Sequence, residues 1–184
     1  MRRKRFLIFS IIVFGTITFL GANAQSKIDE KESARLFVQK FYDWYSALYN
    51  ADNPGAETQP SSQQVAMKHS REFFSANLQK ALTNYYGTPR KDGDIGLDFD
   101  PFIAGQDSGP GYETGNIKEA GNKFLVDVHS IKKGETHQAV LAAELIVVAE
   151  VTKESGHWVI ANFTYVDSGK RYDLLGLLKD QAKG

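Results

Sequence analysis

Hydrophobic residues recur every three or four positions along the stretch Ser33–Tyr49, which is the spacing of an amphipathic helix with one buried stripe. The stripe consists of Ala34, Phe37, Val38, Phe41, Trp44, Tyr45 and Leu48. Asp29 and Glu32 are placed to cap the start of this helix. The turn-forming residues Asn50–Gly55 end it, and we expect the polar chain from there through Gln64 to be a mobile surface loop.

A second helical pattern begins near Phe73 and closes at Gly87, shortly before Pro89. Its apolar residues are Phe73, Phe74, Leu78, Ala81, Leu82 and Tyr85. Ser75 is a suitable N-cap, because its hydroxyl can accept a hydrogen bond from the first helical turn. The stretch Arg90–Asn122 is rich in glycine and aspartate and has no helical period. We expect it to be a loop that holds one short strand at most.

The hydrophobic period changes to two after Asn122, which indicates strands. Phe124, Val126 and Val128 alternate with Leu125, Asp127 and His129, which predicts one strand. A turn at Lys133 and Gly134 leads to a second, long strand, Gln138–Val151. One face of this strand is apolar and consists of Leu141, Ala143, Leu145, Val147, Ala149 and Val151. A turn at Glu154–Gly156 starts a third strand, His157–Val166, and the segment Tyr172–Lys183 returns to a helical pattern. This order predicts an α+β fold, in which N-terminal helices pack on a curved, cone-like antiparallel sheet and a short helix ends the chain.

The N-terminus has the three parts of a secretory signal peptide. A basic segment, Arg2–Arg5, precedes the apolar run Phe6–Leu20, and the small residues of Ala22–Ala24 form a cleavage signature before Gln25. The run is short for a membrane span, which needs about 20 residues. We therefore expect residues 1–24 to be removed and residues 25–184 to form a single domain. The alternative is an uncleaved N-terminal anchor, and only that form would contact the membrane.

The composition limits the chemistry open to this domain. The chain has no cysteine, which excludes disulfides, thiolate catalysis, thiolate metal sites and the acylated cysteine of a lipid anchor. The whole chain balances 22 basic against 22 acidic residues, and the leader holds four of the basic ones, so the remainder has 18 against 22, a net charge of −4. Nucleic acid is therefore not expected as a partner.

The densest group of carboxylates is an aspartate-rich stretch made up of Asp92, Asp94, Asp98, Asp100 and Asp107. Their spacing invites comparison with a calcium-binding loop. The comparison fails because Leu97 stands at the position of the sharp-turn glycine and Ile103 at that of the bidentate acid. We interpret the stretch as a solvated loop whose aspartates form turns with their own backbone, and we predict no metal site.

The four histidines, at positions 69, 129, 137 and 157, do not form a metal-ligating motif. His129 shares a predicted strand face with Asp127. If the sheet curls into a cup, both could line a pocket beside Glu144 or Asn162, where one of them would be a candidate general base. The alternative places them on the solvated side of an antiparallel sheet. No nucleophile elbow, phosphate-binding loop or dinucleotide-binding motif is present, so no cofactor is expected.

Four segments together resemble the domain of unknown function 3828 family of small exported bacterial envelope proteins. They are Phe37–Trp44, Phe73–Leu82, Asp100–Phe102 and His157–Ile160 with Tyr165, and the likeness runs from about Leu36 to Lys179. The resemblance implies a nuclear-transport-factor-like (cystatin-like) α+β cone and export, and it carries over no catalytic residues. Many members are lipoproteins, and this chain departs from them by lacking the lipidation cysteine.

The segment from Asp98 to Phe102, with Asp107 nearby, is the candidate binding loop that the resemblance singles out. Its structural interpretation is that Pro101 fixes the backbone, Phe102 anchors the loop in the core and the aspartates cap a following turn. As a whole, the sequence favours a non-catalytic exported binding or accessory protein of the bacterial cell envelope, with another envelope protein as its partner. The alternatives are an immunity protein or inhibitor of an envelope-acting toxin, and a small-molecule pocket enzyme of the isomerase or hydratase type.

Overall fold

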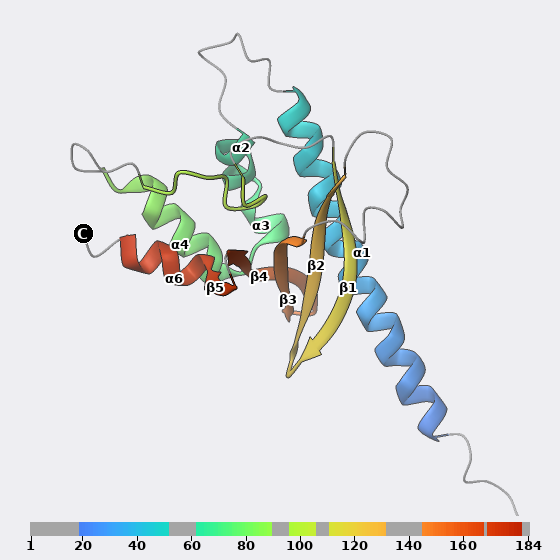
Figure 1. The fold of residues 1–184 in the computed structure, drawn as a ribbon. Coiled ribbons are helices and arrows are strands. Elements are labelled where there is room, and N and C mark those ends of the chain that lie inside the picture. Colours follow the sequence, from blue (N-terminus) through green and yellow to red (C-terminus); the bar gives the residue numbers. More distant parts are fainter. Residues whose placement is uncertain are drawn as a thin grey trace, which may run out of the picture.

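A computed structural model describes residues 19–51, 62–89, 96–105, 111–131, 145–167 and 169–181 (Figure 1). The helices are α1 (Phe19–Ala51), α2 (Ser62–Lys68), α3 (Ser70–Phe73), α4 (Ala76–Gly87) and α6 (Leu174–Gln181). The strands are β1 (Gly111–Ala120), β2 (Lys123–Ile131), β3 (Leu145–Glu154), β4 (His157–Asp167) and β5 (Lys170–Asp173). The predicted α+β class is therefore confirmed.

The five strands form one open sheet in the order β1-β2-β3-β4-β5, and every neighbouring pair is antiparallel. Extra residues shift the register once in each of the first three ladders, and such bulges bend a strand and increase its twist. The β3–β4 connection is a tight turn in which Ser155 and Gly156 both adopt positive φ angles, of 50° and 82°. This geometry matches the twist of a two-residue hairpin, as the sequence Glu154–Gly156 predicts.

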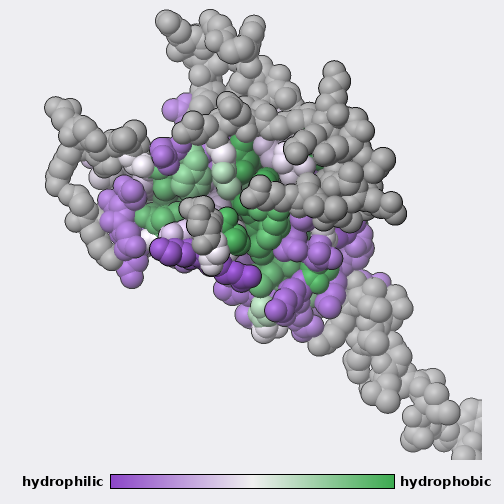
Figure 2. Space-filling view, viewed as in Figure 1, coloured by the Kyte–Doolittle hydropathy of each residue, from purple (hydrophilic) through white to green (hydrophobic). Residues whose placement is uncertain are grey.

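The core lies between the helices and one face of the sheet. The sheet contributes alternate residues, including Val126 and Val128 from β2 and Val147, Ala149 and Val151 from β3. Phe41 of α1 lies at the centre, stacked on Tyr45 with ring centroids 5.6 Å apart and in edge contact with Phe74 at 5.4 Å. Figure 2 shows the outcome on one face, where hydrophobic residues gather in the middle and hydrophilic residues flank them.

Helix α1 covers part of the free edge of β1 with its side chains. The side-chain amide of Gln39 donates to the carbonyl of Tyr112 at 3.0 Å and accepts from the N–H of Thr114 at 2.9 Å, as the backbone of a neighbouring strand would. Arg35 adds a hydrogen bond from Nη1 to Thr114 Oγ1 at 2.9 Å. Part of an otherwise open strand edge is thereby covered by side chains of a helix.

Among the described helices, α4 and α6 are capped at their starts by side chains. Ser75 caps α4 by accepting a hydrogen bond from the N–H of Leu78 at 3.2 Å, which confirms the prediction. At the start of α6, Asp173 accepts from the N–H of Gly176 at 2.9 Å, and Asn162 of β4 accepts from the N–H of Leu175 at 3.1 Å. The side chain of Asn162 therefore helps to cap the start of α6.

The predicted capping of the first helix is wrong. Helix α1 begins at Phe19, so Asp29 and Glu32 lie within it instead of at its start. Glu32 forms an ion pair with Arg35, one helical turn further on, at 2.6 Å. The long helix also includes the expected cleavage junction between Ala24 and Gln25.

Three predicted boundaries also differ from the structure. The stretch Arg90–Asn122 contains β1, a ten-residue strand that the sequence hides because most of its residues are polar or glycine. The last helix begins at Leu174, since Lys170–Asp173 pairs with β4 as a strand. Of the expected loop through Gln64, the last residues belong to α2, and residues 52–61 lie outside the described part of the chain, as do residues 132–144 with the predicted turn at Lys133.

Candidate functional site

The predicted binding loop lies largely in the core. Asp100 is 3% exposed and Phe102 is fully buried, and Pro101 between them is buried as well. Asp98 is exposed, and Asp107 lies outside the described residues. The ring of Phe102 stacks on Phe74 at 5.2 Å, so the anchoring role predicted for Phe102 is what its contacts show.

Asp100 organises the turn that follows it. One carboxylate oxygen accepts from the N–H of Phe102 at 2.8 Å, and the other accepts a short hydrogen bond from the hydroxyl of Tyr45. The backbone N–H of Asp100 donates to the carbonyl of Gly105 at 2.8 Å, and its carbonyl accepts from the N–H of Ala104 at 2.9 Å. Asp100 therefore forms a turn with its own backbone, as the sequence suggests, but inside the molecule instead of in solvent.

Two more tyrosines satisfy the carbonyl groups of this turn. Tyr42 of α1 donates to the carbonyl of Phe102 at 2.7 Å, and Tyr165 of β4 donates to that of Pro101 at 2.6 Å. Burial raises the pKa of both hydroxyls well above the ordinary tyrosine value, and the nearby Asp100 raises each further. The turn is thus a structural element whose polar groups point into the protein.

The predicted pocket is not assembled on the inner face of the sheet. Asp127 pairs with Val148 and lies on the face opposite Val126 and Val128, which point into the core. Asn162 shares the outer face with Asp127 but lies two strands away, about 10 Å by the usual strand spacing. His129 is 5% exposed and stands at the register shift between β2 and β3.

Glu144, the fourth residue considered for that pocket, lies outside the described residues. The inner face itself is filled by aromatic and aliphatic side chains, among them Phe41, Tyr45, Phe102, Val128, Ala149 and Phe163. Within the described part of the chain, Asp127 therefore faces outward, and the space in which a cup would form is occupied by the core.

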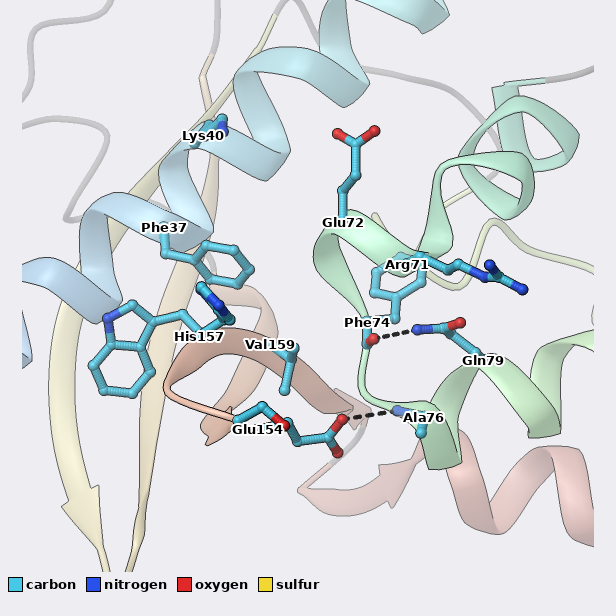
Figure 3. A pocket seen from close by; sticks show the side chains of 12 residues that line it. Phe37, Lys40, Arg71, Glu72, Phe74, Ala76, Gln79, Glu154, His157 and Val159 are labelled. Atoms are coloured by element: carbon cyan, nitrogen blue, oxygen red, sulfur yellow. Dashed lines mark hydrogen bonds between the residues drawn. The ribbon is translucent and has the colours of Figure 1, made fainter.

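A different concavity lies where α1, the α3–α4 junction and the β3–β4 hairpin meet, and we call it the hairpin groove (Figure 3). It has a volume of about 580 Å³. Its apolar lining consists of Phe37, Phe74, Trp158 and Val159, and its polar lining includes Lys40, Arg71, Glu72, Gln79, Glu154 and His157. Helix α1, the helices α3 and α4, and the two hairpin strands each contribute, so residues far apart in the sequence share one surface.

The hairpin is attached to α4 on one side of this groove. The carboxylate of Glu154 accepts from the N–H of Ala76, the first residue of α4, at 3.1 Å. The N–H of Ser75 donates to the carbonyl of Ile160 at 2.9 Å, which makes an isolated parallel bridge between Phe74 and β4. A carboxylate at a helix start is also favoured by the helix dipole.

The hairpin is attached to α1 on the other side. The indole N–H of Trp158 donates to Ser33 Oγ at 2.9 Å. The ammonium group of Lys153 lies 4.5 Å from the centroid of the Trp158 ring and 2.7 Å from the Glu30 carboxylate. The exposed ion pair between Lys153 and Glu30 contributes little to stability by itself. The buried part of Trp158 gives the contact between the hairpin and α1 its specificity.

Some of the described charged side chains around the hairpin groove form no ion pair with one another. Within the described residues, the side chains of Lys40 and Arg71 make no ion pair or hydrogen bond, and both residues are exposed. Glu72 lies 3.4 Å from His69 Nδ1, and Glu154 is engaged by the N–H of Ala76. The groove thus offers free cationic groups, whereas its acids already have contacts.

A second concavity, of about 630 Å³, lies between α1 and β1. Arg35 and Gln39, two of its polar lining residues, are used to hold β1, as described above. Asp43, also in the lining, accepts from the Gln39 amide at 2.8 Å. Because its polar groups bind one another, this surface is a weaker candidate than the hairpin groove.

No family model, curated protein or solved structure matches this chain. None of the described helices combines the length and the apolar character needed to cross a membrane. The described residues also contain no group of three or more His, Asp or Glu side chains arranged to hold a metal ion.

Sequence reasoning did not single out the hairpin groove. Trp158 and Lys40 belong to two segments of the family resemblance, but Lys40 and Arg71 stand on the polar sides of separate helices. Nothing in their local spacing indicates that they meet, because the contact depends on where the β3–β4 hairpin docks.

The substitution Asp100→Asn should destabilise the protein by about 2 kcal/mol, because an amide offers one acceptor oxygen where the carboxylate offers two. Either the Tyr45 hydroxyl or the N–H of Phe102 then loses its acceptor. Asp98→Asn, at an exposed position, is the matched control and should change stability by less than about 0.5 kcal/mol. Urea unfolding of both variants measures the difference, and equal losses would contradict a structural role specific to Asp100.

Stability should decline above about pH 10, where tyrosine normally ionises. The unfolded chain then loses protons that folded Tyr42 and Tyr165 retain, so alkali favours unfolding; below pH 10 this contribution is fully present. Tyr42→Phe should make the decline of unfolding free energy with pH less steep than in the unaltered protein. Denaturant titrations from neutral to alkaline pH test this, and identical slopes for the variant and the unaltered protein would refute it.

Proposed function

We propose that this chain is a non-catalytic binding protein that is exported to the bacterial cell envelope, where another envelope protein is its partner. The hairpin groove is its binding surface. The observation that carries the proposal is the composition of this groove, which combines half-buried aromatic rings with charged side chains that are unpaired within the described residues. Such a mixture of apolar contact area and accessible charge is typical of surfaces that recognise proteins.

The construction of the groove supports binding more than catalysis. Its walls are connected by hydrogen bonds between Glu154 and α4 and between Trp158 and α1, and such contacts favour a surface that is formed before a partner arrives. Of the two residues that the sequence suggested as a general base, Asp127 lies on the outer face of the sheet, and neither it nor His129 lines this groove. Within the described residues, fold analogy with pocket enzymes therefore gains no support from this groove.

The N-terminal segment supports export. Its basic start, apolar run and Ala22–Ala24 signature are those of a secretory signal peptide. The described contacts from the start of α1 to the rest of the molecule begin with Glu30 and Ser33, after the expected junction. Removal of residues 1–24 would therefore leave the attachment of the β3–β4 hairpin to α1 intact.

N-terminal sequencing of the protein recovered from the periplasm or the medium should begin at Gln25. Changing Ala24 to a bulky residue should block processing, because signal peptidase requires a small residue at that position. A mature product that keeps residues 1–24 and needs detergent for extraction would instead support the uncleaved anchor.

A photo-reactive benzoylphenylalanine placed at Glu72, which lines the hairpin groove and is exposed, should form a covalent adduct with a partner in intact cells. The same group at Lys80, which is exposed on α4 outside the groove lining, is the matched control and should give no such adduct. Denaturing gels and mass spectrometry identify the product. Adducts of equal yield at both positions, or none at either, would overturn the assignment of the groove as the binding surface.

A further inference from the structure

The outer edge of β4 is only partly covered. Strand β5 pairs with Thr164–Asp167, and Ser75 donates to the carbonyl of Ile160, whose backbone groups therefore point toward this edge. The β3–β4 ladder runs without a register shift from Ile160 to His157. Because the backbone groups of a strand point to alternate edges, those of Trp158 point to the same edge as those of Ile160, which is the edge that lines the hairpin groove.

The charges around this open edge favour an acidic ligand. Lys40 and Arg71 are exposed and, within the described residues, their side chains have neither an ion pair nor a hydrogen bond. The lining also holds two acids, but each has a contact already, Glu72 with His69 and Glu154 with the N–H of Ala76. Residues 25–184 carry a formal net charge of −4, so the two free cations of the groove stand out against the charge of the chain as a whole. Complementary charge of this kind selects partners and speeds their association.

The apolar part of the groove has room for an anchor side chain. Phe37 and Trp158 are half-buried and packed against the core, which leaves part of each ring accessible from the groove. Phe74, fully buried, forms the wall between them and α4. An aromatic or branched side chain entering here would bury apolar area against rings that are already immobilised.

From these three features we infer that the hairpin groove binds an extended acidic segment of the partner protein, with an apolar anchor residue. This inference rests on the proposed function and specifies the chemistry of the partner segment that the groove recognises. The backbone of the segment lies along the open edge of β4 at Trp158, its carboxylates face Lys40 and Arg71, and its anchor lies against Phe37. An exposed strand edge recognises a peptide backbone, which an anionic lipid surface does not possess, and this favours a peptide.

The test is selection from a display library of random peptides of about twelve residues, panned on the mature protein at low salt. Selected peptides should contain more Asp and Glu than the unselected library, next to an aromatic or branched residue. For a synthetic copy of the most enriched peptide, the double substitution Lys40→Glu and Arg71→Glu should raise Kd on the order of tenfold or more, because two attractive contacts become repulsive. Lys80→Glu, a single charge reversal at an exposed α4 position outside the groove lining, should stay within about twofold.

Several results would overturn the inference. The first is a library that yields no binders, or binders without an excess of acidic residues. The second is binding that is equally sensitive to Lys80→Glu. The third is loss, in the double variant, of binding to vesicles that contain phosphatidylglycerol while no peptide binds, which would assign the cations to a membrane surface. Circular dichroism melting establishes that both variants fold, as expected for substitutions at exposed positions.

The same experiments separate the inference from the proposed function. If photo-crosslinking at Glu72 captures a partner but selected peptides are not acidic, the groove is a binding surface and only the stated ligand chemistry is wrong. If crosslinking at Glu72 captures nothing, the proposed function fails and the inference fails with it.

Discussion

The structure depends on a polar turn that is buried in an aromatic core. A turn such as Asp100–Phe102 normally lies at the surface, because its backbone groups need water. Here the hydroxyls of Tyr42 on α1 and Tyr165 on β4 donate to two backbone carbonyls of the turn, and the hydroxyl of Tyr45 on α1 donates to the carboxylate of Asp100. An unsatisfied buried polar group costs about 1 to 3 kcal/mol, so the turn and the three tyrosines stabilise one another's positions.

This arrangement also fixes the relation between α1 and the sheet. Tyr42 and Tyr45 stand on α1, Tyr165 stands on β4, and the turn between them carries Phe102 into contact with Phe41 and Phe163. Rotating α1 would remove two of the three donors at once. The helix is held a second time at the β1 edge by Gln39, so the edge strand β1 and strand β4 are both positioned against one helix.

Much of this fold could be predicted from local sequence patterns. The helical stripe around Phe41, the N-cap Ser75 and the turn at Ser155 and Gly156 are determined by residues close to one another in the chain, and the structure has all three. Strand β1 could not be predicted in the same way. Its polar, glycine-containing sequence becomes a strand because β2 pairs with it and Gln39 of α1 covers its edge.

Local sequence patterns predicted the candidate sites even less well than the fold. Spacing alone placed Asp98 and Asp100 together in a solvated loop, but packing separates them, with one exposed and the other buried beneath Tyr45. Alternation along β2 correctly put Asp127 and Val128 on opposite faces, but it could not say which face the helices cover. That choice follows from the apolar residues of all the strands together, and it directs Asp127 outward.

The hairpin groove exists because one short turn is anchored at two separated points. Trp158 holds the hairpin to α1, and Glu154 holds it to the start of α4, so the two helices are kept apart across the width of the turn. The space between these anchors is lined by side chains of α1 on one wall and of α3 on the other. Lys40 therefore lies on the first wall and Arg71 on the opposite one. A partner that fills this space touches three separate parts of the chain at once, and its affinity therefore depends on tertiary packing that no single motif encodes.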